Sequence, residues 1–147
     1  MRIALASDHA GFLLKERIKK QLTELGHEFL DRGCFDENAV DYPDFGFLAA
    51  RDVAEGTAER AVMVCGSGIG MSIVANKVKG VRAALCTSPE LAEMSRRHND
   101  ANILTLGARF TEPEIALQIM EVWLNTPFEG GRHQRRVDKI EAKADSR

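Results

Sequence analysis

Short apolar runs alternate along this chain with segments of helical periodicity, and this alternation constrains the fold more than any other feature. The apolar runs predict five strands, at residues 3–7, 28–31, 61–65, 81–86 and 103–106. Helical spacing and capping signals predict helices at residues 14–25, 42–55, 70–77, 89–98, 111–125 and about 131–145. Strands that alternate with helices favour βαβ units, in which the strands run parallel and the helices cover both faces. The sequence therefore predicts an α/β, Rossmann-like three-layer sandwich with a five-stranded parallel sheet.

Three of the predicted helices begin at recognisable signals. Ser88 precedes Pro89, which is the pattern of an N-cap followed by proline at the first helical position. Thr111 and Glu114 have the spacing of a capping box. The pair Gly130-Gly131 breaks the chain before a last helix rich in Arg and Lys.

The size and composition fit one domain over residues 1–147. Hydrophobic residues make up 44% and charged residues 29%, which is globular composition. The net charge of −2 and the pI of about 6.1 argue against a nucleic-acid partner. The longest charge-free stretch, residues 61–76, is too short and too polar to span a membrane. An odd number of cysteines, three, without an export signal predicts reduced thiols in a cytoplasmic protein.

Two strand ends carry the residues best suited to chemistry. Ligands of open parallel sheets bind at the carboxyl ends of the strands. The first predicted strand ends in Ser7-Asp8-His9-Ala10-Gly11, and the third ends in Cys65-Gly66-Ser67-Gly68-Ile69-Gly70. Three alternating glycines let the backbone approach a ligand, and a helix start adds partial positive charge. The loop is therefore a candidate anion cradle; the alternative is a tight turn that binds nothing.

The spacing of this loop argues against three familiar glycine-rich or phosphate-binding loops. A dinucleotide fingerprint counted from Gly66 needs its last glycine where Met71 stands. A P-loop would need glycine and lysine where Met71 and Ser72 stand. A cysteine-centred phosphatase loop counted from Cys65 would need arginine at Met71. Nucleotide binding and phosphatase chemistry therefore lose support.

Cys65 is the cysteine whose context favours a chemical role. It ends a strand beside a helix start, where a thiol ionises more readily and can act as nucleophile or general base. The alternative is a buried core cysteine, which is the reading adopted for Cys34 and Cys86.

Histidines and arginines supply further candidates. His9, His98 and His133 stand among polar residues and could move protons, although each could also be a surface or capping histidine. No HExxH or CxxC pattern is present, so no metal site is predicted.

Three arginines could bind an anion. Arg132 and Arg136 are four residues apart, so they share one helical face and could bind a phosphate together; a solvated basic face is the alternative. Arg109 follows the fifth strand, at the same end of the sheet as Cys65.

Taken together, these motifs resemble the sugar-phosphate isomerase family that includes B-type ribose-5-phosphate isomerases and galactose- and allose-6-phosphate isomerases. The resemblance covers essentially the whole chain. It rests on Ser7-Asp8-His9-Ala10-Gly11, Asp41-Tyr42-Pro43, Cys65-Gly66-Ser67-Gly68-Ile69-Gly70, Ala75-Asn76-Lys77, Arg97-His98-Asn99-Asp100-Ala101-Asn102 and Glu129-Gly130-Gly131-Arg132-His133. It implies interconversion of ribose 5-phosphate and ribulose 5-phosphate through an enediolate, without metal or cofactor.

The resemblance also implies roles for particular residues. Cys65 matches the base that moves a proton between C1 and C2, and His98 matches the acid that opens the furanose ring. Asp8 and Ser67 are candidates for proton relay, with their separate roles open. Met71 stands where one branch of the family has a glutamate base, which places this chain in the cysteine branch. The other matched positions are contacts to the sugar or its phosphate: Asp8, His9, Tyr42, Gly66, Ser67, Gly68, Ile69, Gly70, Asn99, Arg109, Arg132 and Arg136.

The predicted topology separates two groups of these residues. Cys65 follows a strand, whereas His98 ends a helix that is about 15 Å long and returns toward the opposite edge. Arg132 and Arg136 follow another returning helix. We therefore expect a homodimer or tetramer whose sites are shared between subunits, with the helix at about 131–145 packing on a partner.

Several alternatives stay open at this point. A thiol hydrolase or acyltransferase with a Cys65–His98 dyad would use the same residues. A sugar-phosphate-binding regulator could use the same fold without catalysis. The sequence leaves open the preference for five- or six-carbon substrates and the choice between dimer and tetramer.

Overall fold

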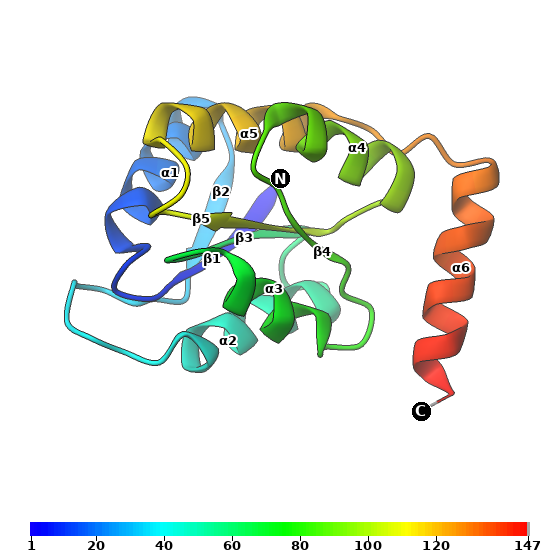
Figure 1. Cartoon of the computed structure of the whole chain (residues 1–147), viewed down its shortest axis with the longest axis horizontal. Coiled ribbons are helices and arrows are strands. Elements are labelled where there is room, and N and C mark those ends of the chain that lie inside the picture. Colours follow the sequence, from blue (N-terminus) through cyan, green and yellow to red (C-terminus); the bar gives the residue numbers. More distant parts are fainter. Residues whose placement is uncertain (147) are drawn as a thin grey trace.

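Five parallel strands form the sheet that the sequence predicts. The computed structural model describes residues 1–146. The strands pair in the order β2-β1-β3-β5-β4, and every neighbouring pair is parallel (Figure 1). Their bounds are β1 Arg2–Ser7, β2 Glu28–Asp31, β3 Arg60–Cys65, β4 Ala83–Leu85 and β5 Ile103–Gly107.

Helices cover both faces of this sheet, which confirms the predicted three-layer α/β sandwich. The helices α1, α4 and α5 lie on one face, and α2 and α3 lie on the other (Figure 1). The last helix, α6, stands beside the sandwich and packs against α4. The bounds are α1 Phe12–Glu24, α2 Tyr42–Ala54, α3 Ile69–Asn76, α4 Pro89–Asn99, α5 Pro113–Asn125 and α6 Arg132–Asp145. Over residues 1–146, no helix has both the length and the apolar character needed to cross a membrane.

The two cores follow from the two-residue period of the strands. In β1, Ile3 and Leu5 face the cluster under α1, α4 and α5, whereas Ala4 and Ala6 face the cluster under α2 and α3. All four side chains are fully buried. Small residues in the second cluster let α2 and α3 lie close to the sheet, beside the loop that follows Cys65.

The fourth strand is shorter than predicted, because side-chain oxygens accept hydrogen bonds from the backbone N–H groups at its start. The sequence predicts a buried strand over residues 81–86, but β4 covers Ala83–Leu85 at the sheet edge, and these residues are only partly buried. The N–H of Arg82 donates to Asn102 Oδ1 at 2.8 Å, and the N–H of Ala83 donates to Asn76 Oδ1 at 2.9 Å. Because β4 is an edge strand, no neighbouring strand binds its outer side, and these two bonds hold its start in place instead.

One helix cap is as predicted and one is not. Ser88 caps α4, and its hydroxyl oxygen accepts from the N–H of Leu91 at 3.3 Å. The capping box at Thr111 is wrong, because α5 has Glu112 at its N-cap and no side-chain cap. Starting one residue later puts Pro113 at the first helical position, which its fixed φ favours and where its missing N–H costs nothing. Glu114 pairs with Arg17 of α1 instead, at 2.8 Å.

A buried lysine joins α1 to the end of β2. Lys15 is fully buried, and its Nζ lies 2.5 Å from Asp31 Oδ1. Burial alone would raise the pKa of Asp31, but hydrogen bonds from Lys15, the N–H of Gly33 and Lys19 lower it below its ordinary value of 3.8. The ionised carboxylate is therefore the form that the fold stabilises.

Asp31→Asn should destabilise the protein in a pH-dependent way. The substitution leaves Lys15 buried with only Glu16 nearby, at 3.8 Å. We expect the free energy of unfolding at pH 7 to fall by about 3 kcal/mol. Because the folded pKa is lowered, the contribution of Asp31 is complete above its unfolded pKa and disappears as the pH falls through the folded pKa. Urea unfolding at pH 7 and pH 3 measures this.

The exposed Glu37→Gln is the matched control and should change little at either pH. An Asp31→Asn loss that is equal at pH 7 and pH 3 would contradict the assigned role of the charge.

Candidate functional site

A cavity at the carboxyl edge of the sheet collects most of the predicted site residues. Its volume is about 420 Å³. The residues come from the end of β1, the start of α2, the β3–α3 loop with the first turns of α3, and the segment after β5. They are Asp8, Tyr42, Cys65, Gly66, Ser67, Ile69, Gly70, Ile73, Arg109 and Phe110.

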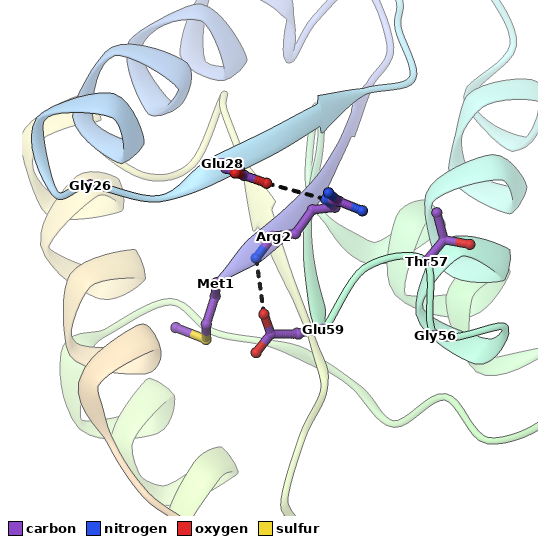
Figure 2. Close-up of a pocket in the computed structure, with 7 residues that line it drawn as sticks. All are labelled: Met1, Arg2, Gly26, Glu28, Gly56, Thr57 and Glu59. Carbon is purple, nitrogen blue, oxygen red and sulfur yellow. Dashed lines mark hydrogen bonds and ion pairs between the residues drawn. The ribbon is translucent and has the colours of Figure 1, made fainter.

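A cavity of similar size at the opposite edge has a different character. Its volume is about 430 Å³, and it lies at the amino ends of β1 and β2 (Figure 2). Arg2 pairs there with Glu28 at 3.4 Å, and its N–H donates to Glu59 Oε1 at 3.2 Å. None of the predicted site residues lines it. The carboxyl-edge cavity is therefore the candidate site.

Cys65 is the last residue of β3 and presents its thiol to the glycine loop. The side chain lines the cavity, although the residue is only 4% exposed. The N–H of Gly68 donates to Sγ at 3.2 Å. This bond fixes the sulfur against the glycine loop, at the wall of the cavity. Ser67 makes no hydrogen bond to this sulfur in the described structure; its Oγ accepts from the N–H of Ile69 at 3.2 Å.

The glycines of this loop are required by close packing. Gly68 has φ +79°, and a Cβ there would lie 2.5 Å from the side chain of Leu85 and 2.9 Å from the carbonyl carbon of Leu106. A Cβ on Gly107 would lie 2.5 Å from the carbonyl oxygen of Ser67. A Cβ on Gly70 would lie 2.6 Å from the ring of Tyr42. The loop thus rests directly on the end of β5 and under the Tyr42 ring.

Asp8 and His9 follow β1, and Asp8 lines the same cavity as this loop. The N–H of Asp8 donates to the carbonyl oxygen of Val64 at 3.2 Å, which ties the end of β1 to β3. Asp8 Oδ1 accepts from the N–H of Gly11 at 3.0 Å. His9 Nδ1 lies 3.2 Å from the N–H of Val40 and accepts from it. Nε2 of a neutral His9 then carries the proton and is a donor for an anion.

Arg109 brings positive charge to the cavity. Its Nη1 would lie 3.2 Å from a Cβ on Gly66, so the guanidinium lies over the glycine loop. Within residues 1–146, no carboxylate comes within ion-pair distance of Arg109. This charge is available to an anionic ligand.

Four predicted site residues lie away from this cavity. His98 and Asn99 end α4, and the chain then enters β5 at its amino end, where the N–H of Ala61 donates to the carbonyl oxygen of Asn102. Cys65 instead pairs in register with Gly107, at the carboxyl end of β5. Asn99 lines a separate cavity of about 560 Å³ between α3 and α6. One chain therefore places the two groups of residues at opposite edges of its sheet.

The two arginines of α6 belong to the second group. Arg132 and Arg136 are exposed on the helix that stands beside the sandwich. Neither lines the carboxyl-edge cavity of its own chain.

His98 has close neighbours that sequence reasoning did not connect to it. The rings of His98 and His133 stack, with centroids 4.3 Å apart and planes 11° apart. His133 is buried, and its Nε2 lies 3.5 Å from Glu129 Oε2. Burial and the nearby His98 lower the pKa of His133. Glu129 lies in the loop before α6, so no helical spacing joins it to His133 and the sequence carries no local signal for this contact.

These three side chains also form a group with metal-ligating atoms. The ligating atoms of His98, Glu129 and His133 lie within 4.8 Å of one another. A ring nitrogen binds a metal in the plane of its ring, so two nearly parallel rings direct their lone pairs side by side rather than toward one ion. The arrangement fits a stacked pair of imidazoles better than a metal site.

Comparison with known proteins identifies relatives over nearly the full chain. The Ribose/Galactose Isomerase family matches residues 3–140. Ribose-5-phosphate isomerase B of Escherichia coli is 43% identical over 141 residues, which cover 96% of this chain and 95% of that protein.

Two solved structures have the same fold throughout. Ribose-5-phosphate isomerase B of Clostridium thermocellum has a TM-score of 0.98 at 47% identity and covers 99% of both chains. The Mycoplasma genitalium enzyme, solved with bound ribulose-5-phosphate, has a TM-score of 0.96 at 40% identity and covers 99% of this chain and 97% of its own. With a family match from the first strand into the last helix, this chain belongs to the Ribose/Galactose Isomerase family.

Proposed function

We propose that this chain interconverts ribose 5-phosphate and ribulose 5-phosphate, with Cys65 as the base that carries the proton between C2 and C1. The observation that carries the proposal is the Cys65 thiol in the carboxyl-edge cavity, with the N–H of Gly68 on its sulfur. The ribose-5-phosphate isomerases B of Escherichia coli and Clostridium thermocellum support the reaction, as does the Mycoplasma genitalium structure with bound ribulose-5-phosphate.

The chemistry needs one base and a site for a developing oxyanion. The Cys65 thiolate removes the C2 proton of the open-chain aldehyde, and the electron pair moves to give an enediolate with negative charge on O1. The O2 proton then passes to O1, and return of the proton from Cys65 to C1 gives the ketone. Backbone N–H groups held in place stabilise such charge. Within residues 1–146, the N–H groups of Ser67 and Gly70 have no protein acceptor, so they are available for this role.

The phosphate of the substrate needs positive charge around the same cavity. Arg109 supplies a guanidinium over the loop, and His9 follows Asp8 at the end of β1, with its Nδ1 bound by the N–H of Val40. Holding the phosphate orients the carbon chain so that one base can reach both C1 and C2. Arg132 and Arg136 would add bidentate contacts if they came from a second copy.

A site shared between two copies would bring the remaining residues to the substrate. His98, the proposed ring-opening acid, lies with Asn99 at the amino edge of its own sheet, away from Cys65. A two-fold dimer that sets this edge of one copy against the carboxyl edge of the other forms two sites at once. The position of α6 beside the sandwich supports this arrangement, since it buries Val137 but leaves Ile140 half exposed. The three buried, unbridged cysteines suit a reducing compartment such as the cytoplasm.

Cys65→Ala should abolish proton transfer while leaving the binding of substrate intact. We expect kcat for ribose 5-phosphate to fall by about 10²–10⁴-fold or more, because the general base is lost. The Kd for ribose 5-phosphate, measured by calorimetry, should change by less than about threefold. Cys86→Ala is the matched control, since this buried cysteine does not line the cavity and should retain turnover. Turnover near the wild-type rate in Cys65→Ala would exclude the assignment, and an accumulating acyl-enzyme would favour a thiol hydrolase instead.

Iodoacetamide should modify Cys65 before the other two cysteines. Burial raises the pKa of Cys86 above its ordinary value of 9.0, which keeps that thiol protonated at neutral pH. Cys34 is buried, and its thiol lies 3.3 Å from the carbonyl oxygen of Asp36 as a donor. Peptide mass spectrometry should find the label on Cys65, with activity lost in proportion, and ribose 5-phosphate should slow both. Loss of activity with the label on Cys34 or Cys86 and none on Cys65 would contradict the prediction.

A mixture of two inactive variants should regain activity if the site is shared. Cys65→Ala and His98→Ala proteins are dissociated together and reassembled. Each hybrid dimer has one intact site and one doubly defective site. Random reassembly makes about half of the dimers hybrids, so activity should return to about a quarter of wild type. Each variant taken alone through the same procedure is the control. No recovery, with subunit exchange shown by mass spectrometry, would mean that each site comes from one chain.

A further inference from the structure

We propose that His133 is a positioning residue for His98: held by Glu129, its ring stacks on the His98 ring and fixes the orientation in which His98 delivers a proton to the ring oxygen of the sugar. The inference rests on the proposed role of His98 as the ring-opening acid. It assigns a role to a histidine that neither lines the carboxyl-edge cavity nor needs to touch the substrate.

The contact between the two rings is the geometric basis. A ring at the end of a helix can turn about two side-chain bonds, and His98 has no hydrogen-bond partner within residues 1–146 that would stop it. The His133 ring lies against it at 4.3 Å between centroids and 11° between planes. This near-parallel contact restricts the His98 ring to one plane and leaves both of its nitrogens free at the edge.

A clamp on Glu129 holds His133 in turn. The N–H of Glu129 donates to the carbonyl oxygen of Arg97 at 3.1 Å, and the Arg97 guanidinium pairs with the Glu129 carboxylate. The other carboxylate oxygen lies 3.5 Å from His133 Nε2. The turn between them has Gly130 and Gly131 at φ +68° and +58°, which lets the chain reverse into α6. Arg97, which precedes His98 in α4, thus holds Glu129 in place, and Glu129 in turn orients His133.

The burial and the charges around the two histidines favour the neutral form of His133. His133 is buried, and Arg132 and Arg136 on its own helix oppose a positive charge on it, as does His98. Glu129 opposes this, but the net effect lowers the pKa of His133. A neutral His133 can lie against the His98 ring without charge repulsion. The lowered pKa keeps His133 itself neutral, which suits a positioning role rather than that of the acid.

Two reactions separate a role in ring opening from a general role in the site. Conversion of ribose 5-phosphate starts from a furanose and needs the ring opened. Ribulose 5-phosphate cannot close a furanose, because its O5 carries the phosphate, so its C1 proton can exchange with solvent through Cys65 alone. Conversion is measured as ketose formed, and exchange as deuterium gained at C1 in D₂O.

His133→Ala should lower the rate of conversion by about 10–100-fold, the loss expected when a reacting group is misplaced. Exchange should stay within about threefold of wild type. His133→Phe restores a flat ring for stacking and should recover most of the conversion. Glu129→Gln alone should lower conversion. Combined with His133→Ala it should cause little further loss, because Glu129 acts through His133. Gln134→Ala, the exposed neighbour of His133 in α6, should change neither rate.

Other outcomes would overturn the proposal in distinguishable ways. If conversion and exchange fall in parallel in a folded His133→Ala protein, His133 supports the fold or substrate binding instead. If His133→Ala converts at the wild-type rate, stacking has no catalytic role. His98→Asn should lose conversion and keep exchange, while Cys65→Ala should lose both. Full conversion by His98→Asn would remove the acid that His133 is said to position, and exchange by Cys65→Ala would refute the proposed base separately.

Discussion

The whole site depends on one contact between two stretches of backbone. The loop after Cys65 lies so close to the end of β5 that Gly68 meets Leu106 and Gly107 meets Ser67 with no space for a Cβ. This contact sets the direction in which the N–H of Gly68 points, and so it places a donor on the Cys65 sulfur. It also fixes where the chain leaves β5, which brings Arg109 over Gly66. The contact between the loop and the end of β5 thus positions the Cys65 thiol, the Gly68 N–H and the Arg109 guanidinium together.

A parallel sheet divides the remaining chemistry between its two edges. Every strand ends at the same edge, so residues that follow strands gather there, whereas residues that end helices gather at the other. Asp8 and Cys65 belong to the first group, and His98 belongs to the second. No local adjustment can bring these groups together, because the length of the strands separates them. The proposed site shared between two copies would bring both groups to one substrate.

The sequence was sufficient for the features that depend on local patterns. Alternating apolar runs specify five buried or edge strands, and the glycine spacing after Cys65 specifies a loop with close backbone contacts. It was insufficient where distant side chains compete for backbone groups. The β4 strand begins late because the side chains of Asn76, at the end of α3, and Asn102, just before β5, accept from the N–H groups at its start. Likewise, Thr111 has the spacing of a cap, but the position of Pro113 moves the start of α5 by one residue.

Helix α6 has no share in either core of the sandwich, since its buried residues lie against α4 and the turn that precedes it. The sheet and its covering helices can therefore remain folded whether or not α6 is held in place. On a shared site, separation of the two copies would leave each one folded, with a thiol at one edge and an acid at the other that no single substrate can reach together. Dilution would then switch off the chemistry of this protein long before it disturbed its fold, and the concentration of the chain would set its activity per molecule.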